Sequence, residues 1–419
     1  MTSLSEKLRA LGVRLGSEPE LKKTTQRPAN EQVKVNLESA FGGKLVSTER
    51  GLAFFVETIY PADHMHGIYP ISSNNTLRTI SRVANEPSLA EMGYEDLAFI
   101  DTETSGLNGG TGTYAFMIGV GRFIVGEFVL RIYFMPDPSL EAGMLRALAD
   151  FLAPCKALVT FNGKAFDAPL LRNRYLLNDE ICPFSGFAHL DLLTLSRRLW
   201  RARLPSRALK YLENEILGVF RTSEEVPGYE IPWIYFDYLK SGDPEPMRRV
   251  FYHNSLDVVS MVTLLNLFNN LLEDPHGEQL SHGQDIIALA RVFEELGMWD
   301  DAARLYEKGL REQMPEVDFH QAVKRLAVLH KRRGDLELAE ALWQSAAEQG
   351  HLYAFIELAK LHEHRYKNPT LALSWVERCG TTISSKEMPE YVLSYWQVEI
   401  GKRRERLIRK AGANHVDKT

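Results

Sequence analysis

Cysteine, net positive charge and long apolar runs are all scarce in this sequence. The 419 residues include 3 cysteines, and their odd number and wide spacing give neither a disulfide framework nor a Cys-x-x-Cys zinc motif. No stretch approaches the ~18 uninterrupted apolar residues of a membrane helix, and the N-terminus lacks a signal-peptide core. We therefore expect a protein of a reducing, cytoplasmic compartment with no membrane partner.

A strongly positive surface is also missing. The formal net charge is −6, so any contact with nucleic acid must come from local basic patches. The segment "SRRLWRARLPSRALKY" surrounds Trp200 with such a patch, made of Arg197, Arg198, Arg201, Arg203, Arg207 and Lys210. The patch fits a surface that follows a phosphate backbone, and it fits a solvated helix face equally well.

Composition divides the chain into five parts. Residues 1–40 turn polar and proline-containing after a short amphipathic piece, which is typical of a flexible arm. Residues 41–95 hold β-rich runs between turn residues and predict a small β-containing extension. Residues 96–275 form the main unit, residues 284–400 a set of helices, and residues 401–419 a basic tail, which we expect to be solvated.

The main unit alternates strands and helices. "DLAFIDTE", "AFMIGVGRFI" and "EFVLRIYFM" predict three strands, and "SLEAGMLRALADFLAP" has the spacing of a helix that Pro154 ends. "ALVTFNG" predicts a further strand, and a helix follows it. Three strands, helix, strand, helix is the order of a ribonuclease-H-like α/β core, in which helices flank a mixed sheet.

The helical part repeats itself. Aligning its turns superposes small residues in successive helical pairs: Gly297 on Gly334, Ala290 on Ala327, and Ala302 on Ala339. Small residues let paired helices approach closely, and about three such units can bury a shared core. The pattern resembles a short tetratricopeptide-like array, with an ordinary helical bundle as the alternative.

Two acids follow the first predicted strand of the core. Asp101 and Glu103 are two residues apart, so on a strand both side chains point to one face, at the carboxyl end where α/β proteins place their sites. Neighbouring like charges repel unless a cation lies between them. Ordinary surface acids at an exposed strand end are the alternative.

Further acids stand at two other places in the core. Asp167 starts the helix after the strand that ends at Asn162, near the same edge of the sheet. His253 and Asp257 are four residues apart on a predicted helix and share a face. Each group alone is explained by ordinary structural roles, but the three together are not.

These motifs resemble a known family. "DTET", "FNGKAFD" and "HNSLD" are similar, in order, to the three exonuclease motifs of the DEDD 3′–5′ exonuclease superfamily, which has a ribonuclease-H-like fold. "DTETSGLNGGTGTYAF", "HLDLLTLSRRLW" and "EVPGYEIPWIYFDYL" narrow the resemblance to the YprB-like branch of ribonuclease-H-like proteins. The resemblance spans roughly residues 45–275.

The resemblance implies roles for individual residues. The metal ligands would be Asp101, Glu103, Asp167 and Asp257, and they would hold two Mg²⁺ or Mn²⁺ ions, which prefer such oxygen ligands. His253 would be the general base. The histidine subclass places its base five residues before the last aspartate, and here Tyr252 occupies that position, so Tyr252 stays an alternative.

The substrate contacts are less specific. The candidates are Thr104, Gly110, Asn162 and Lys164, which lie in or beside the first two motifs. His189 and Asp191 in "HLDLL" fit the family pattern and also fit a structural role.

The implied function is a metal-dependent nuclease. We expect a 3′–5′ exonuclease acting on single-stranded DNA or RNA, with helical repeats that position the substrate or bind a protein partner. A nucleic-acid-binding or scaffold protein without turnover, or an endonuclease on structured nucleic acid, is the alternative.

Overall fold

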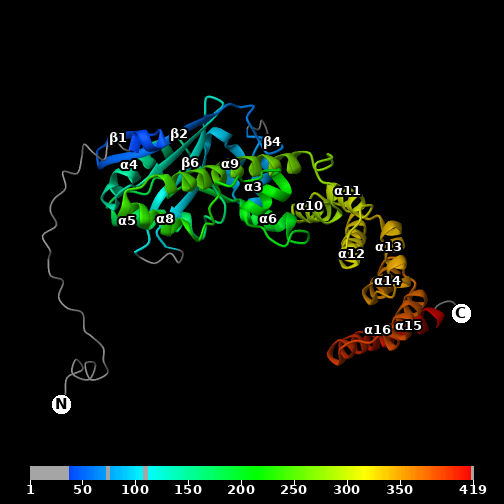
Figure 1. Ribbon diagram of the computed structural model, residues 1–419. Coiled ribbons are helices and arrows are strands. Elements are labelled where there is room, and N and C mark those ends of the chain that lie inside the picture. Colours follow the sequence, from blue (N-terminus) through cyan, green and yellow to red (C-terminus); the bar gives the residue numbers. More distant parts are fainter. Residues whose placement is uncertain (1–36, 72–75, 107–111, 417–419) are drawn as a thin grey trace, which may run out of the picture.

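The core of the molecule is a mixed sheet whose strands bring polar residues to one edge. The computed structural model describes residues 37–71, 76–106 and 112–416 (Figure 1). The strands lie in the order β1-β2-β7-β6-β5-β8-β9. Their bounds are Lys44–Thr48, Gly51–Tyr60, Glu127–Phe134, Ala115–Ile124, Leu97–Thr104, Ala157–Thr160 and Ala188–Asp191. Strands β5, β6 and β7 are antiparallel neighbours, whereas β8 and β9 join parallel to β5.

Strand β5 shows why the sheet forms in this register. Its first four residues are buried and apolar, and its last four are polar and partly buried. The apolar half fixes the strand in the interior, since a shift by one residue would turn its side chains to the opposite face. Asp101 and Glu103 therefore come out at the carboxyl edge.

Helices cover both faces of the sheet. Helix α4, Glu141–Leu152, accepts a hydrogen bond from Tyr133 of β7 at the carbonyl of Ala147. The next residue, Phe134, points to the other face, where its ring packs against Phe251 of α9. The prediction of a ribonuclease-H-like mixed sheet flanked by helices is confirmed.

Two predicted boundaries are wrong. Strands β1 and β2, assigned to a separate extension at residues 41–95, continue the central sheet because β2 pairs with the free edge of β7. Residues 37–40, assigned to the flexible arm, are helical, and Leu37 is buried. The rest of the predicted arm, residues 1–36, lies outside the described residues.

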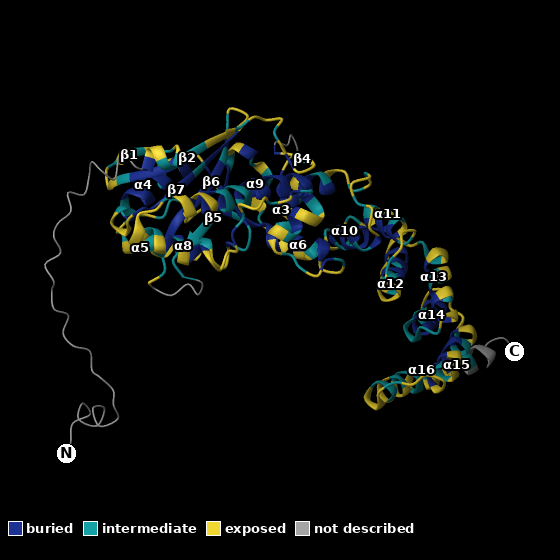
Figure 2. Cartoon of the chain, viewed as in Figure 1, coloured by how far each residue is buried: buried dark blue, intermediate teal, exposed yellow. Residues whose placement is uncertain are grey.

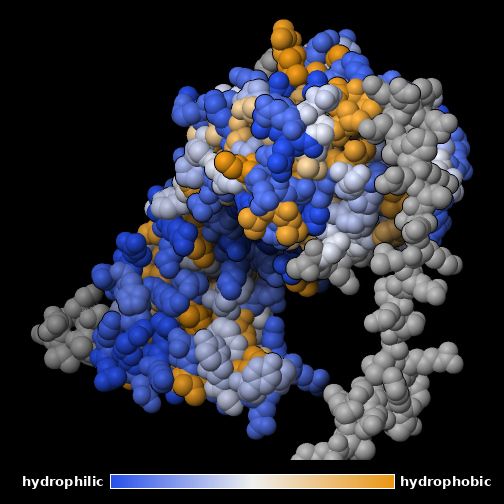
Figure 3. Space-filling model, turned by 90° about the vertical axis from the view of Figure 1, so that its left-hand side faces the viewer, coloured by the Kyte–Doolittle hydropathy of each residue, from blue (hydrophilic) through white to orange (hydrophobic). Residues whose placement is uncertain are grey.

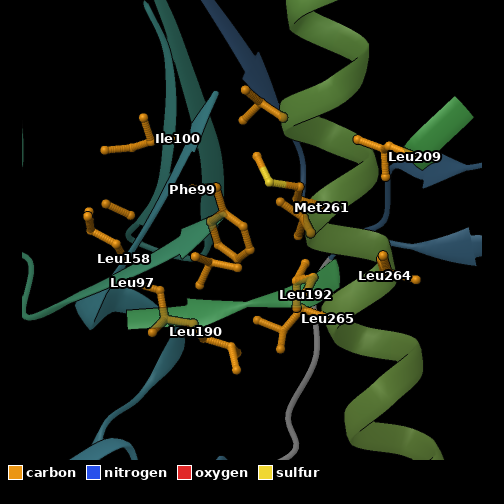
Figure 4. Close-up of a cluster of buried hydrophobic side chains, with 14 of the residues drawn as sticks. Leu97, Phe99, Ile100, Leu158, Leu190, Leu192, Leu209, Met261, Leu264 and Leu265 are labelled. Atoms are coloured by element: carbon orange, nitrogen blue, oxygen red, sulfur yellow. The ribbon is translucent and has the colours of Figure 1, made fainter. Parts of the chain in front are cut away.

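Helix α9, Glu245–Glu273, is the longest helix of the α/β domain and carries His253 and Asp257 in its first half. It is long and apolar enough to cross a membrane, but 78% of its apolar window is buried inside the protein (Figure 2), as in the core helix of a soluble protein. Its second half packs on the sheet, where Met261, Leu264 and Leu265 lie with Phe99 and Leu190 in one hydrophobic cluster (Figure 4).

Smaller elements complete the α/β domain. They are the two-residue strands β3 and β4, Met65–His66 and Tyr69–Pro70, and the helices α3, α5, α6, α7 and α8, at Arg78–Ala84, Asp167–Leu177, Leu192–Trp200, Leu209–Leu212 and Ile231–Ser241. A π-helical turn, η4, follows α7 at Glu213–Leu217. The extended loop after η4 returns the chain to the carboxyl edge of the sheet.

The C-terminal part of the chain is a series of helices, α10 to α16. They span Gly283–Glu295, Trp299–Gly309, Glu316–Arg333, Leu336–Glu348, Leu352–His364, Pro369–Ser384 and Glu390–Val416. Successive helices pack as pairs and lead away from the α/β domain in a curve (Figure 1). The superposed alanines of the sequence repeat are fully buried in these pairs, and Gly297 and Gly334 both have a positive φ.

The structure differs from the predicted solvated basic tail, residues 401–419, over its described part, which ends at residue 416. Helix α16 runs through this segment, and Leu407 is buried. Arg406 and Lys410 bind Glu363 of α14, with Lys410 Nζ 2.8 Å from Oε1. The positive charges therefore have a buried carboxylate partner, which a composition count does not reveal.

Candidate active site

The carboxyl end of β5 presents its side chains alternately to two helices. Asp101 faces α9, where its Oδ2 accepts a hydrogen bond from Asn254 Nδ2 at 2.8 Å. Glu103 also faces α9, with Oε1 3.7 Å from His253 Nε2. Thr102, between them, points the other way and donates to Asp167 Oδ1 at the start of α5. Successive side chains of a strand point to opposite faces, so Asp101 and Glu103 lie toward α9 and Thr102 lies toward α5.

The fit between Asp101 and Asn254 depends on a glycine. Gly119 of β6 pairs directly with Asp101 across the sheet. A Cβ at Gly119 would lie 2.1 Å from Asn254 Oδ1. The absence of a side chain at this position therefore makes the room in which buried Asn254 reaches Asp101.

His253 lies in a shell of carboxylates. Its Nε2 is 3.5 Å from Asp257 Oδ2, one helical turn along α9. Its Nδ1 lies 3.1 Å from Glu225 Oε1 and 3.3 Å from Arg221 Nη1, so a carboxylate and a guanidinium together hold this side of the ring. Tyr252 is directed elsewhere, since its hydroxyl oxygen accepts a hydrogen bond from the backbone N–H of Thr222 at 3.0 Å.

A buried arginine connects these groups. The Arg221 side chain is 3% exposed and pairs with Asp257 Oδ1, with Glu225 at 3.0 Å and with Glu213 at 2.6 Å. Burial opposes its charge, but the bonds to Glu213 and the charge of Asp257 outweigh burial and raise the pKa of the guanidinium above its ordinary value. Arg221 thus acts as a permanent cation behind the acid cluster.

The surroundings of the four motif acids disfavour their charged forms. Burial, followed by the charges of Asp257 and Asp167, raises the pKa of Asp101 well above its usual range. Burial, followed by the charge of Asp101, does the same to the pKa of Glu103. The pKa values of Asp167 and Asp257 are also raised, first by burial. Negative charge is therefore in excess here even with Arg221 present.

The four carboxylates are of the kind that binds hard divalent cations, although they do not surround an ion site in their present positions. Four buried carboxylates with no cysteine are the ligands that Mg²⁺ and Mn²⁺ prefer. Over residues 37–71, 76–106 and 112–416, no three His, Cys, Asp or Glu donors lie close enough together to hold an ion as they stand. Hydrogen bonds from Arg221 to Asp257 and from Thr102 to Asp167 occupy oxygens that an ion would use.

A pocket of about 840 Å³ opens beside the acids. Its lining joins the end of β5 to α5 and includes Asp101, Thr104, Asn162, Phe166 and Asp167. Phe166 is 58% exposed, so its ring offers a surface on which a nucleobase can stack. Asn162 has a φ of 69°, a left-handed conformation that asparagine tolerates.

Two of the other substrate candidates lie differently. Lys164 is not part of the pocket lining, and its ammonium group lies 3.1 Å from Glu86. Gly110 lies outside the described residues.

His189 and Asp191 hold the scaffold. Asp191 Oδ1 accepts hydrogen bonds from the backbone N–H groups of Asn162 at 2.8 Å and Leu193 at 3.0 Å, so it fixes the β8 loop and caps α6. His189 Nε2 lies 2.8 Å from Thr160 Oγ1, and burial lowers its pKa to about 4. The charge of Asp191 adds to the causes that raise the pKa of Asp167, so Asp191 also acts on the acid cluster from its position in the scaffold.

The sequence motifs did not reveal Arg221, Asn254 and Glu225. Arg221 and Glu225 come from an irregular loop whose path no periodic pattern predicts. Asn254 carried a usable signal, because it is a fully buried amide inside an apolar helix and such a group needs a hydrogen-bond partner.

A sequence profile described as the RNase_H superfamily matches residues 98–269. The chain is 31% identical over 360 residues to the "Uncharacterized protein YprB" of Bacillus subtilis (strain 168), covering 83% of this chain and 86% of that protein.

One solved structure, the family B DNA polymerase from the hyperthermophilic archaeon Pyrobaculum calidifontis, shares 16% identity at a TM-score of 0.33. The match covers 48% of this chain and 29% of the polymerase chain, so it is confined to a minor part of that enzyme.

The profile match and the mixed sheet flanked by helices identify residues 98–269 as a domain of the RNase_H superfamily. Within that superfamily, the chain belongs to the YprB family.

Proposed function

We propose that this protein is a metal-dependent 3′–5′ exonuclease acting on single-stranded DNA or RNA. The observation that supports the proposal is the meeting of four buried acids, raised in pKa by burial and by one another, with His253 at one edge of the sheet. Such an excess of buried negative charge favours bound cations.

Asp101, Glu103, Asp167 and Asp257 would hold two Mg²⁺ or Mn²⁺ ions, which supply charge neutralisation at the phosphate and acidify the attacking water. Asn254 keeps Asp101 oriented through its 2.8 Å hydrogen bond. Arg221 offsets part of the repulsion around Asp257, so that the acids remain close together before an ion arrives.

His253 is the proposed general base. Glu225 and Arg221 beside Nδ1 hold the ring with Nε2 toward Glu103 and Asp257, and in the neutral ring with its proton on Nδ1 this nitrogen would accept the proton of the attacking water. Replacing His253 by Gln should therefore lower cleavage far more than Tyr252→Phe, because the Tyr252 hydroxyl bonds to a loop N–H. Equal losses would contradict this assignment.

The pocket beside the acids would hold the terminal nucleotide. Phe166 offers a stacking surface, while Thr104 and Asn162 offer polar contacts at the same edge. A pocket that receives one unstacked base suits single strands and chain ends better than a duplex. Lys164 and Gly110 remain candidates for phosphate contacts.

The helical array is proposed to be tetratricopeptide-like and to position substrate or bind a protein partner, and we propose a cytoplasmic location for the whole protein. The paired helices with fully buried alanines support this assignment of the array.

Cleavage of 5′-labelled single-stranded DNA and RNA tests the proposal. The wild type should give a ladder that shortens from the 3′ end with Mg²⁺ or Mn²⁺ and not with EDTA. Asp101→Asn should reduce the rate by roughly 100-fold or more, because it removes a ligand without changing size. Asp237→Asn, at a side chain that is 79% exposed, is the matched control.

Absence of metal-dependent cleavage of either polymer would overturn the nuclease proposal. In that case, the alternative of a binding or scaffold protein without turnover would gain support. Internal cuts in hairpin substrates would instead identify an endonuclease.

A further inference from the structure

An arginine-lined cleft lies far from the acids, where the α/β domain meets the first helix of the array. Helix α6 packs against α10, and the cleft between them has a volume of about 680 Å³. Its lining includes five arginines, namely Arg197, Arg198, Arg201, Arg207 and Arg291. No lysine lines it. Of the five, only Arg291 comes from the array, so the cleft exists only when the two parts of the chain are joined.

The positive charge of this cleft is only partly compensated. Two carboxylates reach its lining, Glu295 and Asp318, of which Glu295 pairs with Arg198. Arg197 and Arg201 are exposed and have no hydrogen-bond or ion-pair partner within the described part of the chain. Five guanidinium groups against two carboxylates leave an excess of positive charge, in a protein whose formal net charge is −6.

Two of the arginines also have unused donors. The Nε atoms of Arg207 and Arg291 are buried and lack a hydrogen-bond partner among the described residues. The planar guanidinium fork matches the oxygens of a phosphate group, which a lysine contacts only as a point charge.

The cleft and the acid cluster are separated along the axis of α9. Trp200, next to Arg201, packs on Phe268 of α9 with ring centroids 5.3 Å apart. Phe268 follows Asp257 on the same helix, and at about 1.5 Å per residue the two levels are separated by roughly 16 Å. This axial offset is a lower bound on the distance between the cleft and the acids, so a strand whose 3′ end lies at the acids would reach the cleft only with nucleotides further from that end.

Seen from the end of the molecule, hydrophilic side chains dominate the surface of the array below the α/β domain (Figure 3). Hydropathy does not give the sign of the charge, so the case for an anionic ligand rests on the arginines of the cleft. An acidic protein segment would meet the same charge, and the proposed action on nucleic acid favours phosphates.

We infer that the cleft between α6 and α10 is a second nucleic-acid site that binds the phosphate backbone of a single strand several nucleotides from its 3′ end. The inference rests on the proposed function for the position of that end. The binding of single-stranded nucleic acid by the cleft does not depend on turnover. The site sets a minimum length for tight binding.

Anisotropy of a fluorescent 20-nucleotide single strand in EDTA tests the cleft without turnover. The variant Arg197→Gln/Arg201→Gln removes two exposed charges, and Arg78→Gln/Arg304→Gln, at two exposed arginines outside the cleft, is its matched control. The cleft variant should bind about 10-fold or more weakly at moderate salt, and its salt slope should fall by about 1.4, at roughly 0.7 per lost contact. The control should match the wild type.

Substrate length separates the two proposals. With Mg²⁺, the cleft variant should cut a labelled trinucleotide as fast as the wild type and a 20-mer with a KM raised about 10-fold. If the wild type cuts both substrates and the cleft variant binds and cuts the 20-mer unchanged, the cleft assignment is wrong and the nuclease stands.

If no protein cuts but the cleft variant binds the 20-mer more weakly, the nuclease proposal fails and the binding site stands. If the wild type fails to bind the 20-mer but an acidic peptide binds and the cleft variant loses that peptide, the occupant is protein and the inference is overturned.

Discussion

Asp101 carries a charge that its surroundings disfavour, and protein stability should depend on pH accordingly. Its pKa is raised in the folded protein, so its contribution to stability is complete below the ordinary value of 3.8 and is lost as the pH rises through the folded pKa. Glu103 adds to the same trend from its ordinary value of 4.5.

Metal-free Asp101→Asn should therefore melt at the same temperature as the wild type near pH 4 and several degrees higher at neutral pH. Asparagine still accepts the hydrogen bond from Asn254. Thermal unfolding in EDTA across this pH range measures the difference, with Asp237→Asn as the surface control. A variant that is less stable than the wild type at every pH would show that the acid is not under electrostatic strain.

Gly119 is the second residue at which a single change is informative. A methyl group there would overlap Asn254, so Gly119→Ala should displace the amide from Asp101, at a cost of about 1–3 kcal/mol in the free energy of unfolding. Cleavage should fall as well, because Asp101 loses its orienting bond. Gly186→Ala, which has open space around the added carbon, is the control.

The double variant Gly119→Ala/Asn254→Ser tests the cause. The smaller side chain should recover part of the stability by relieving the overlap with Asn254, while Val258 Cγ2 stays 2.9 Å from the added carbon and cleavage stays low. Recovery of both properties would mean that Asn254 only fills space.

At the scale of elements, the sequence predicted those strands and helix faces that have a regular pattern of apolar residues or a regular spacing. The apolar run before Asp101 and the four-residue spacing of His253 and Asp257 fixed a strand and a helix face, and the structure has both. These patterns are local, since a strand end and a helix turn place their side chains by geometry alone.

What escaped prediction depends on contacts between distant segments. Pairing of β2 with β7 joins residues 68 to 80 positions apart, and the sequence of an edge strand does not reveal its partner. Arg221 reaches Asp257 from a loop, where neither propensity nor period fixes the path of the chain. The sequence predicts a solvated basic run in α16, because the acceptor of these charges, Glu363, lies on another helix and cannot be identified from the run itself.

Glu363 should decide whether α16 stays docked. Burial raises its pKa, but hydrogen bonds from Lys410 and Arg406 outweigh burial and leave the pKa lowered. Its contribution to stability is therefore present above the ordinary value of 4.5 and is lost as the pH falls through the folded pKa. Glu363→Gln should weaken docking by roughly 1–2 kcal/mol, since its partners are partly exposed.

Hydrogen exchange of α16 amides measures this effect. Exchange should quicken in Glu363→Gln and not in Glu405→Gln, an exposed position on the same helix. Unchanged protection would mean that buried Leu407 alone holds the helix.

At the scale of the whole molecule, the chain has two hydrophobic cores rather than one. The first joins the sheet to α10, α11 and residues of α12 up to Leu329, and the second runs from Ala327 to Leu407. The boundary thus falls inside the helical array, within α12, and not at the junction with the α/β domain. The first pairs of helices should behave as part of the nuclease fold, and so the cleft between α6 and α10 should be rigid.

Calorimetry of the whole chain should accordingly resolve two unfolding transitions. Under the proposed function, Mg²⁺ would bind only the folded acid cluster, so it should raise the midpoint of the transition of the first core and leave the other unchanged. Trp343 is fully buried in the second core, and Trp343→Ala should lower only that transition, at a cost of about 3–5 kcal/mol. Phe268→Ala, in the first core, should do the reverse. If either substitution moved both transitions together, the array and the α/β domain would be a single cooperative unit, and a strand held in the cleft would stabilise the whole chain rather than its first half.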